Sequence, residues 1–377
     1  MPVASSPAKR FAYIDALRGY AILMVMAVHT SEAFPDLPTS LSKILSQGAR
    51  GVQLFFVTSA LTLSMSWVAR QETAVEFYLR RFFRVAPMFW IAIVVFVWIG
   101  GTGPSMYAPE GIGFRHIAMT ALFVHGFWPD AITSVVPGGW SVANEVIFYA
   151  LFPAFVPSLL RASWKSLILV AIASVAIGPQ LSRLDGLSYL LPSSAAGVSG
   201  IYFSLWFPRQ LPCFIFGIIL YRLSVERPPA SSFLAKAICL LAVALMLLIP
   251  FLEGIKYALP LGLVTSYAIA FTLFGFALMN WPNSPLIGHS IIWIGKVSYS
   301  AYFVHFLVLH FLPPLHFTGS AVVDMILAYA VTVAATVAIS SLTYAMVETP
   351  FIRLGSALIA AWPLPAKTKL DQKRNEP

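Results

Sequence analysis

Charged side chains are scarce in this sequence. Asp, Glu, Lys and Arg make up 10% of its 377 residues, whereas hydrophobic residues make up 59%. A soluble globular chain carries about 25% charged residues, so this composition argues against a water-soluble protein. Apolar runs recur along the whole sequence, and about 20 apolar residues suffice to cross a bilayer as a helix. The scarcity of charge therefore predicts a multi-pass membrane protein.

Cysteine is also rare, and neither cysteine belongs to a recognisable site. Cys213 and Cys239 lie in apolar runs without a C-x-x-C partner, so we expect both to be packing residues. His305, His310 and His316 are five and six residues apart, which does not place them on one helical face, so no metal is expected. A Walker loop, a G-x-G-x-x-G motif and a nucleophile elbow are missing as well.

The basic residues give the sequence a net charge of +9, but they do not form one cluster. They sit in short loops between apolar runs, so nucleic acid is not an expected partner. Those on the side of the N-terminus far outnumber those on the other side, which predicts that both termini are cytoplasmic. Because the first apolar run contains Asp15, Arg18 and His29, we do not expect a cleavable signal peptide. The predicted location is the plasma (inner) membrane, with lipids as neighbours.

We predict an all-α transmembrane bundle of about ten spans, and no fixed-period repeat. The spans run roughly over residues 15–34, 50–69, 82–100, 140–158, 164–178, 204–223, 233–252, 257–279, 290–313 and 321–346. The longest connection is 101–139, and its apolar part, 114–128, is expected to form a short interfacial or re-entrant helix. Residues 1–355 are assigned to the membrane domain, and 356–377 to a basic, disordered cytoplasmic tail.

The first span carries polar residues at helical spacing. Asp15, Arg18, His29 and Glu32 fall on one stripe when steps of three and four residues are followed. Arg18 and His29 are about 16 Å apart at 1.5 Å per residue. Ionisable residues inside a membrane are costly and are functional candidates, and histidine can exchange a proton near neutral pH. A helix end with an Asp15–Arg18 pair and a structural histidine explains the same pattern.

A resemblance to a known family begins at this span. The segment YIDALRGYAILMVMAVH, with ten residues between Arg18 and His29, resembles the signature of the membrane-bound acyltransferase family 3. The resemblance implies a ten-helix domain that acylates glycans and other acceptors, most commonly with acetyl groups. His29 is then the expected general base, or alternatively a transient acyl carrier, and Arg18 is expected to act near the donor.

A second match carries three arginines. FYLRRFFRVAPMFW, residues 77–90, resembles the next motif of the family and contains Arg80, Arg81 and Arg84 at one end of a span. Guanidinium groups suit phosphate, so these residues are candidates for binding the phosphates of acetyl-CoA or another acyl-CoA. Ordinary positive-inside anchoring is the alternative explanation.

A third match lies at the start of the span at 140–158. GGWSVANEVIFYALFP resembles the family's Trp-Ser-x-x-x-Glu-x-x-Phe-Tyr motif and places Ser141, Glu145 and Tyr149 on one helical face. Glu145 is expected to orient the histidine or to contact the acceptor, and Ser141 and Tyr149 are candidates for substrate binding. Asn144 stands where the family often has a second Glu, so a paired-carboxylate mechanism is not expected. A helix that enters the membrane at an interface is the structural alternative.

The remaining matches are weaker. Residues 51–63 resemble the second-helix motif, with Gln53 in place of an Asp, and are interpreted as a packing helix with small residues at its interface. IGKVSYSAYFVHFLVL, residues 294–309, resembles a late motif in which Tyr302 and His305 are candidates for substrate binding or for structural hydrogen bonds. VETPFIRL, residues 347–354, resembles the closing motif and is expected to end the last helix.

The predicted function is O-acyl transfer from an acyl-CoA to a hydroxyl of a cell-surface or exopolysaccharide glycan, without a metal. A transporter or flippase of a glycan or lipid-linked intermediate is the alternative, since polar residues in a bundle also mark translocation pathways. The sequence lacks repeated halves and paired broken helices that would favour a transporter. A non-catalytic partner in an envelope assembly is a third possibility, and the acceptor and the acyl chain stay open.

Overall fold

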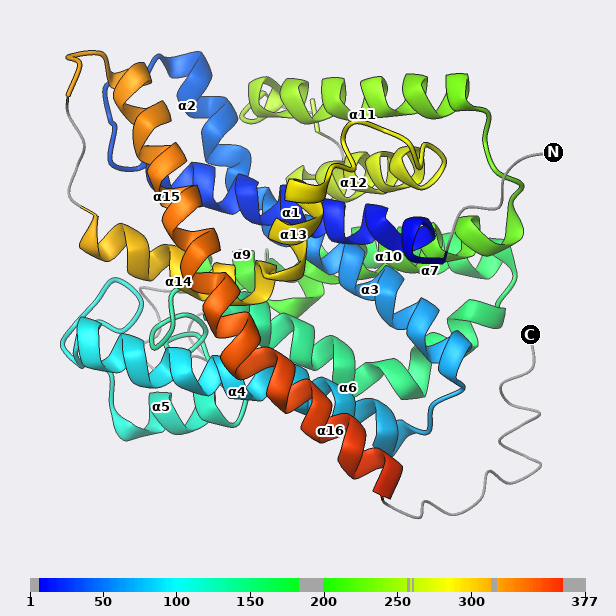
Figure 1. The fold of residues 1–377 in the computed structure, drawn as a ribbon, viewed down its shortest axis with the longest axis horizontal. Coiled ribbons are helices and arrows are strands. Elements are labelled where there is room, and N and C mark those ends of the chain that lie inside the picture. Colours follow the sequence, from blue (N-terminus) through cyan, green and yellow to red (C-terminus); the bar gives the residue numbers. More distant parts are fainter. Residues whose placement is uncertain (1–6, 183–198, 256–257, 260, 313–316, 362–377) are drawn as a thin grey trace. The chain divides into compact units, whose positions relative to one another are not determined.

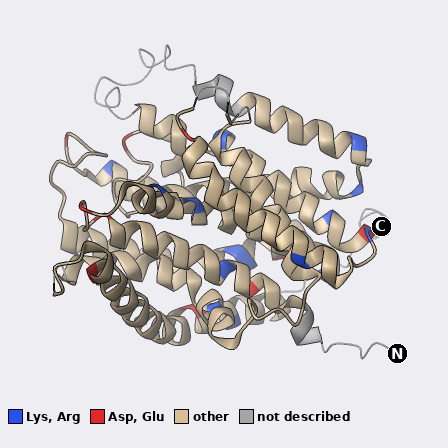
Figure 2. Ribbon diagram, turned by 90° about the horizontal axis from the view of Figure 1, so that it is seen from above, with Lys and Arg blue, Asp and Glu red and all other residues tan. Residues whose placement is uncertain are grey.

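The computed structural model describes residues 7–182, 199–255, 258–259, 261–312 and 317–361. Within these residues the secondary structure is helical and no strand occurs. The all-α prediction is therefore confirmed for the described part of the chain. Lys, Arg, Asp and Glu appear as short blue and red stretches on a ribbon whose described part is otherwise tan (Figure 2).

The chain divides into two compact units. The first unit comprises residues 1–62 and 212–343, and the second comprises residues 63–211 and 344–377. Two of the three boundaries fall inside helices, α3 and α10, and the third lies between α15 and η4. The helices that begin in the first unit are α1 (Pro7–Ser31), α2 (Thr39–Ser46), the 3-10 helix η1 (Gln47–Arg50), α3 (Gly51–Arg70), α11 (Ser232–Leu252), α12 (Leu263–Met279), α13 (His289–Lys296), α14 (Ser298–Phe311) and α15 (Ala321–Thr343).

The helices that begin in the second unit are α4 (Ala74–Gly100), α5 (Phe114–Ala121), the 3-10 helix η2 (His125–Phe127), α6 (Gly139–Arg161), α7 (Trp164–Ser182), α9 (Ser199–Leu205), α10 (Phe207–Glu226), the π-helical turn η4 (Tyr344–Glu348) and α16 (Thr349–Ala361).

Seven helices in the described residues are long and apolar enough to cross a membrane. An eighth span results if α13 and α14 are counted together, although they are bent by 82°. The spans predicted at 164–178 and 257–279 fall on the shorter apolar helices Trp164–Ile177 and Leu263–Met279. The structure thus agrees with a multi-pass membrane protein, while the total of ten spans and the orientation of the termini stay predictions.

The span predicted at 290–313 is broken, because α13 ends at Lys296 and α14 starts at Ser298 in a new direction. The predicted end of the last helix at Pro350 is wrong, because α15 continues through the π-helical turn η4 into α16. Proline is tolerated near a helix start, where its missing N–H would have no partner. α16 reaches Ala361 and includes the first residues of the predicted tail, while 362–377 lie outside the described residues.

Glycines let neighbouring helices pack closely against α1 in the first unit (Figure 1). A Cβ on Gly295 of α13 would lie 1.7 Å from the backbone oxygen of Asp15. A Cβ on Gly51 of α3 would lie 2.2 Å from the backbone oxygen of Ala21. Small residues permit this close approach of helix backbones in membrane proteins. The packing role predicted for the segment at 51–63 is confirmed at Gly51.

In the second unit, α4 is in contact with α5, α6, η4 and α16 (Figure 1). α4 starts with a capping box, in which the Thr73 hydroxyl accepts from the Glu76 N–H and the Glu76 carboxylate accepts from the Thr73 N–H at 2.7 Å. This reciprocal cap satisfies backbone donors that have no partner inside the helix. It fixes the start of the helix at Ala74, nearly two turns before Arg80.

Candidate functional site

His29 lies in the last turn of α1, next to a carboxylate. Its Nδ1 is 3.2 Å from Oε1 of Glu32 and 3.3 Å from Oε2. An ionised carboxylate only accepts hydrogen bonds, so Nδ1 is the protonated nitrogen and Nε2 carries the free lone pair. The side chain of His29 is 27% exposed and that of Glu32 is 62% exposed. The ring is thus oriented by Glu32 and accessible at its edge.

The predicted residue His305 lies beside His29. The two imidazole rings are stacked with centroids 5.5 Å apart, and the Phe306 ring lies 4.7 Å from His29. His305 is fully buried, and its Nδ1 is 3.0 Å from the carbonyl oxygen of Ala301. A carbonyl accepts, so Nδ1 of His305 donates, and its Nε2 has no hydrogen-bond partner among the described residues. Tyr302 is also near, with its ring 6.0 Å from that of His305.

Arg18 lies on the same helix as His29 but makes different contacts. Its Nη2 donates to the Thr62 hydroxyl at 3.3 Å, and its Nη1 is 3.9 Å from the Asp15 carboxylate. The Asp15–Arg18 pair predicted from the sequence is therefore present. Because Arg18 and His29 are about 16 Å apart along the helix axis, the two side chains do not belong to one cluster.

The arginines of the second unit have carboxylate partners that the sequence did not indicate. Nε of Arg80 is 3.7 Å from Glu72, which also lies 3.8 Å from Nε of Arg70. The Ser66 hydroxyl donates to Glu72 at 3.2 Å. The Glu72 side chain is 2% exposed, whereas that of Arg80 is 23% and that of Arg70 is 54% exposed. The carboxylate is buried and the guanidinium groups lie outside it.

Arg84 repeats this arrangement with another acid. Its Nη1 is 3.7 Å from Oε2 of Glu348, whose side chain is fully buried, while that of Arg84 is 30% exposed. Glu348 is the last residue of the π-helical turn, and π-turns within helices occur often at functional sites. Glu348 belongs to a motif that we interpreted as a helix end. The sequence offered no signal for Glu72, which lies in a short turn between two helices.

Arg81 interacts electrostatically with two of the predicted residues of α6. Its guanidinium lies over the Phe77 ring at 5.7 Å from the centroid. The charges of Glu72 and Glu145 and the phenol of Tyr149 are near enough to interact with that of Arg81. Tyr149 is buried and its ring is 6.3 Å from that of Phe77. Arg81, Glu145 and Tyr149 therefore belong to one cluster of the second unit.

The other polar residues of α6 have local roles. The Ser141 hydroxyl donates to the carbonyl of Gly138 at 2.9 Å, so it supports the first turn of the helix. Gly138 adopts a φ of 73°, a left-handed conformation that suits glycine. Asn144 is fully buried and donates to the carbonyl of Leu205 at 2.7 Å. The structure thus gives Asn144 a structural hydrogen bond where the family often has a carboxylate.

The connection at 101–139 contains a hydrogen-bonded network that sequence analysis missed. His116 accepts from the Gly113 N–H at 3.1 Å through Nδ1, so its Nε2 donates to Asp130 at 3.2 Å. Arg115 also donates to Asp130. His125 lies 3.0 Å from the carbonyl of Gly139, and burial lowers its pKa to about 4. A short helix in this segment was predicted and is present as α5, and hydrogen bonds now explain how the segment is held.

The structure groups the predicted residues within each unit. His29, Tyr302 and His305 lie together in the first unit, where Arg18 lies further along α1. Arg81, Glu145 and Tyr149 lie together in the second. No group of three or more His, Cys, Asp or Glu side chains in the described residues is placed to hold a metal ion. The first cluster offers proton transfer at an imidazole, and the second offers cationic groups for an anion.

Comparison with known proteins agrees with these features. A Staphylococcus aureus protein with the provisional name O-acetyltransferase is 25% identical over 92% of this chain. The chain spans 58% of the length of that relative. Acyltransferase MdmB of Streptomyces mycarofaciens is 23% identical over 80% of both proteins. The exopolysaccharide production protein ExoZ of Rhizobium meliloti is 27% identical over 47% of this chain and 57% of its own length.

No solved structure matches the chain. The model of one protein family, described as an acyltransferase domain, matches residues 11–345. This match contains His29, the three arginines, Glu145 and His305, so it covers every predicted site residue. The chain therefore belongs to the acyltransferase family 3.

Proposed function

We propose that this protein is a membrane O-acyltransferase that moves an acyl group, most simply acetyl, from an acyl-CoA to a hydroxyl of a surface glycan. The hydrogen bond between His29 and Glu32, at 3.2 Å, is the observation on which this proposal rests. It leaves Nε2 of an accessible imidazole free to take a proton. The family match and the O-acetyltransferase name of the staphylococcal relative support the reaction class.

In the proposed step His29 acts as a general base. Its Nε2 takes the proton of the acceptor hydroxyl while the oxygen attacks the thioester carbonyl. The tetrahedral intermediate collapses, the C–S bond breaks, and the imidazolium returns the proton to the departing thiolate of coenzyme A. The carboxylate of Glu32 stabilises the imidazolium that forms between the two transfers. A positioned base contributes typically about 10²–10⁴-fold to the rate.

The donor is proposed to bind through its phosphates. Arg80 and Arg84 are partly exposed, and their carboxylate partners are buried. Arg81, on the same turn of α4, is the third proposed contact. Bidentate, charge-assisted hydrogen bonds from such groups suit phosphate. Arg18 is held by Thr62 and Asp15 and is proposed to neutralise negative charge in the first unit, which also contains His29, during the reaction. The approach of coenzyme A from the cytoplasmic side of the inner membrane belongs to this proposal.

The acceptor is proposed to be a glycan hydroxyl. The name of the relative ExoZ, an exopolysaccharide production protein, supports this class of acceptor. Tyr302 and His305 beside His29 are the proposed acceptor contacts of the first unit. Ser141, Glu145 and Tyr149 on α6 are the candidates of the second unit. Nε2 of His305 is a buried acceptor without a partner among the described residues, which suits a second hydroxyl of a sugar.

The test is an acyl-transfer assay on the full chain reconstituted in vesicles, with acetyl-CoA labelled in the acetyl group and a surface glycan extract as acceptor. We expect the label to move to the glycan and free coenzyme A to appear. A transporter or flippase would leave acetyl-CoA intact, and that result would reject the proposal. Mass spectrometry of surface glycans from cells with and without the gene should show the loss of an acetyl group.

A further inference from the structure

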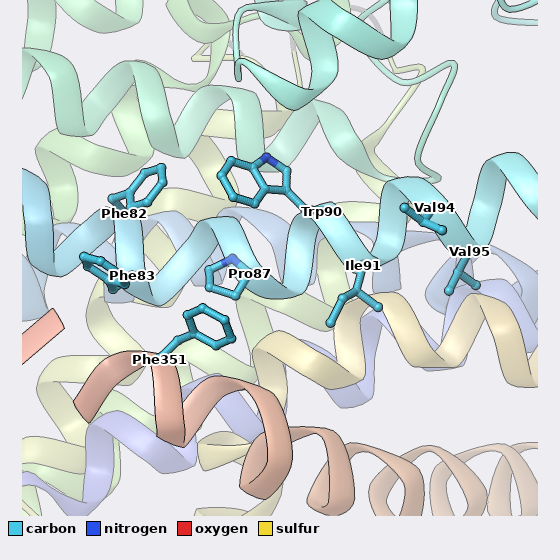
Figure 3. A pocket seen from close by; sticks show the side chains of 8 residues that line it. All are labelled: Phe82, Phe83, Pro87, Trp90, Ile91, Val94, Val95 and Phe351. Carbon is cyan, nitrogen blue, oxygen red and sulfur yellow. The ribbon is translucent and has the colours of Figure 1, made fainter. Parts of the chain in front are cut away.

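An apolar pocket lies between α4 and α16 in the second unit. Its volume is about 420 Å³, within the usual range for a ligand site of roughly 300–1,000 Å³. Figure 3 shows the side chains that line it, seven of them on α4, with the Phe351 ring of α16 lying opposite Pro87. None of the residues so far assigned to acyl transfer lines this pocket.

The pocket offers no hydrogen bond to a ligand through its side chains. Trp90 carries the only polar group among the lining side chains, and its indole N–H already donates to the carbonyl of Ala121 at 2.9 Å. Burying a polar group against such a lining without a partner would cost free energy. The lining therefore selects hydrocarbon over sugars, nucleotides or peptides.

The pocket also opens on the surface of two candidate membrane spans. α4 and α16 belong to the spans Ala74–Gly100 and Ala321–Ala361. Ile91 is 41% exposed, Trp90 42% and Phe351 40%, so these side chains line the pocket and also face outward. In a bilayer the molecules that reach this surface are lipids.

Charge changes along α4 from one end of the pocket to the other. Arg80, Arg84, Pro87, Ile91 and Val94 follow one another at steps of four and three residues, so they share one stripe of the helix. Residues 85–100 carry no charge. The carboxylates that pair with the arginines are buried, so the outward group at this end is guanidinium. One stripe thus joins a cationic end to an apolar hollow.

We propose that this pocket binds an anionic phospholipid, with one acyl chain in the hollow and the phosphate near the arginine end of α4. A phospholipid carries its phosphate close to its acyl chains, and on this stripe the arginines are likewise close to the apolar pocket. In an acyl-CoA the long pantetheine arm separates the phosphates from the chain, so a donor bound at these arginines would place its acyl group elsewhere. The lipid serves as a bound structural partner of α4 and α16.

The test is native mass spectrometry of the full chain released from nanodiscs that contain phosphatidylglycerol and phosphatidylcholine with identical chains in equal amounts. The wild type should retain phosphatidylglycerol in preference. Ile91→Trp fills the hollow, and excluding even two methylene groups should lower retention about tenfold. Leu247→Trp is the matched control, because Leu247 is 48% exposed on a different span, Ser232–Leu252, and it should retain lipid like the wild type.

The headgroup is tested separately with the double variant Arg84→Gln/Glu348→Gln, which removes the ion pair without leaving a buried carboxylate alone. It should keep a lipid and lose the preference for phosphatidylglycerol. Equal retention of both lipids by the wild type, or wild-type retention by Ile91→Trp, would overturn the proposal. Displacement of the lipid by palmitoyl-CoA but not by acetyl-CoA would overturn it in favour of a donor chain. Lipid retention is measured without turnover, so this experiment tests lipid binding even if the proposed acyl transfer is not observed.

Discussion

The proposed role of the His29 imidazole in proton transfer depends on a contact that adds little stability. Glu32 is 62% exposed, and ion pairs between exposed groups contribute at most about 1 kcal/mol. The same contact fixes which ring nitrogen carries the proton, and this decides whether Nε2 can act as a base. Changes at this pair should therefore affect turnover much more than folding.

The first prediction concerns His29→Gln. Acyl transfer should fall by about 10²–10⁴-fold because the glutamine amide cannot take a proton. Glu32→Gln should cause a smaller loss, since an amide oxygen can still accept from Nδ1–H. The assay is acyl transfer by the reconstituted protein, with thermal unfolding as the check on folding. His310→Gln, an exposed histidine on α14, is the matched control, and full activity of His29→Gln would end the proposed mechanism.

The second prediction concerns pH and His125. Burial lowers its pKa from the ordinary 6.5 to about 4, so the unfolded chain binds more protons than the folded chain between these values. The stability that His125 contributes is present above pH 6.5 and declines as the pH falls toward 4, by about 3 kcal/mol at most. Thermal unfolding measured from pH 7 to pH 4 should show a smaller decline for His125→Gln. An identical decline in both proteins would contradict the assignment.

At the scale of helices, the site depends on how closely α13 packs against α1. The third prediction is that Gly295→Ala destabilises the protein by about 1–3 kcal/mol, a typical cost of overpacking. The added Cβ would lie 1.7 Å from the backbone oxygen of Asp15, and backbone cannot move aside as a flexible side chain does. Gly288→Ala is the control, because its nearest neighbour would be 3.8 Å away. The measurement is thermal unfolding of both variants. Equal stability of Gly295→Ala and Gly288→Ala would contradict the close contact.

The fourth prediction joins α4 to η4 through Arg84 and Glu348. Arg84→Gln should destabilise the protein by about 3–5 kcal/mol, because it removes the positive charge that pairs with this buried carboxylate. The double variant Arg84→Gln/Glu348→Gln should recover most of this loss. The apparent KM for acyl-CoA should rise in both variants more than kcat falls, since the arginine is proposed to bind the donor. If the double variant loses as much stability as Arg84→Gln and Glu348→Gln lose together, the two residues are not coupled.

Helix spacing explains what the sequence could predict at this scale. Steps of three and four residues placed Asp15, Arg18 and His29 on one helix, and the Asp15–Arg18 pair is present. Hydropathy located the long spans, but it carries no signal for the bend between α13 and α14 or for the π-helical turn. The partners Glu72 and Glu348 and the stacking of His305 on His29 come from tertiary packing. Periodicity within one segment does not specify such contacts.

For the whole molecule, hydropathy and charge make separate predictions. The apolar helices show that the chain is built for a membrane, but apolar length is the same in either orientation. The orientation is set by Lys and Arg in the short loops. The predicted topology places Arg70, Arg161 and Arg227 on the side of the N-terminus, and Lys43 and Arg115 on the other side.

The last prediction is therefore topological. An alkaline phosphatase reporter, which is active only outside the cytoplasm, should be inactive when fused after the C-terminus and active when inserted at Gly103. Gly103 is exposed, and a Cβ there would meet no atom within 4 Å, so an insertion should disturb the fold little. A fluorescent protein fused to the C-terminus should fold and fluoresce as the reciprocal control. Activity of the phosphatase at the C-terminus would reverse the predicted orientation and would remove the cytoplasmic acyl-CoA pool as the source of the donor.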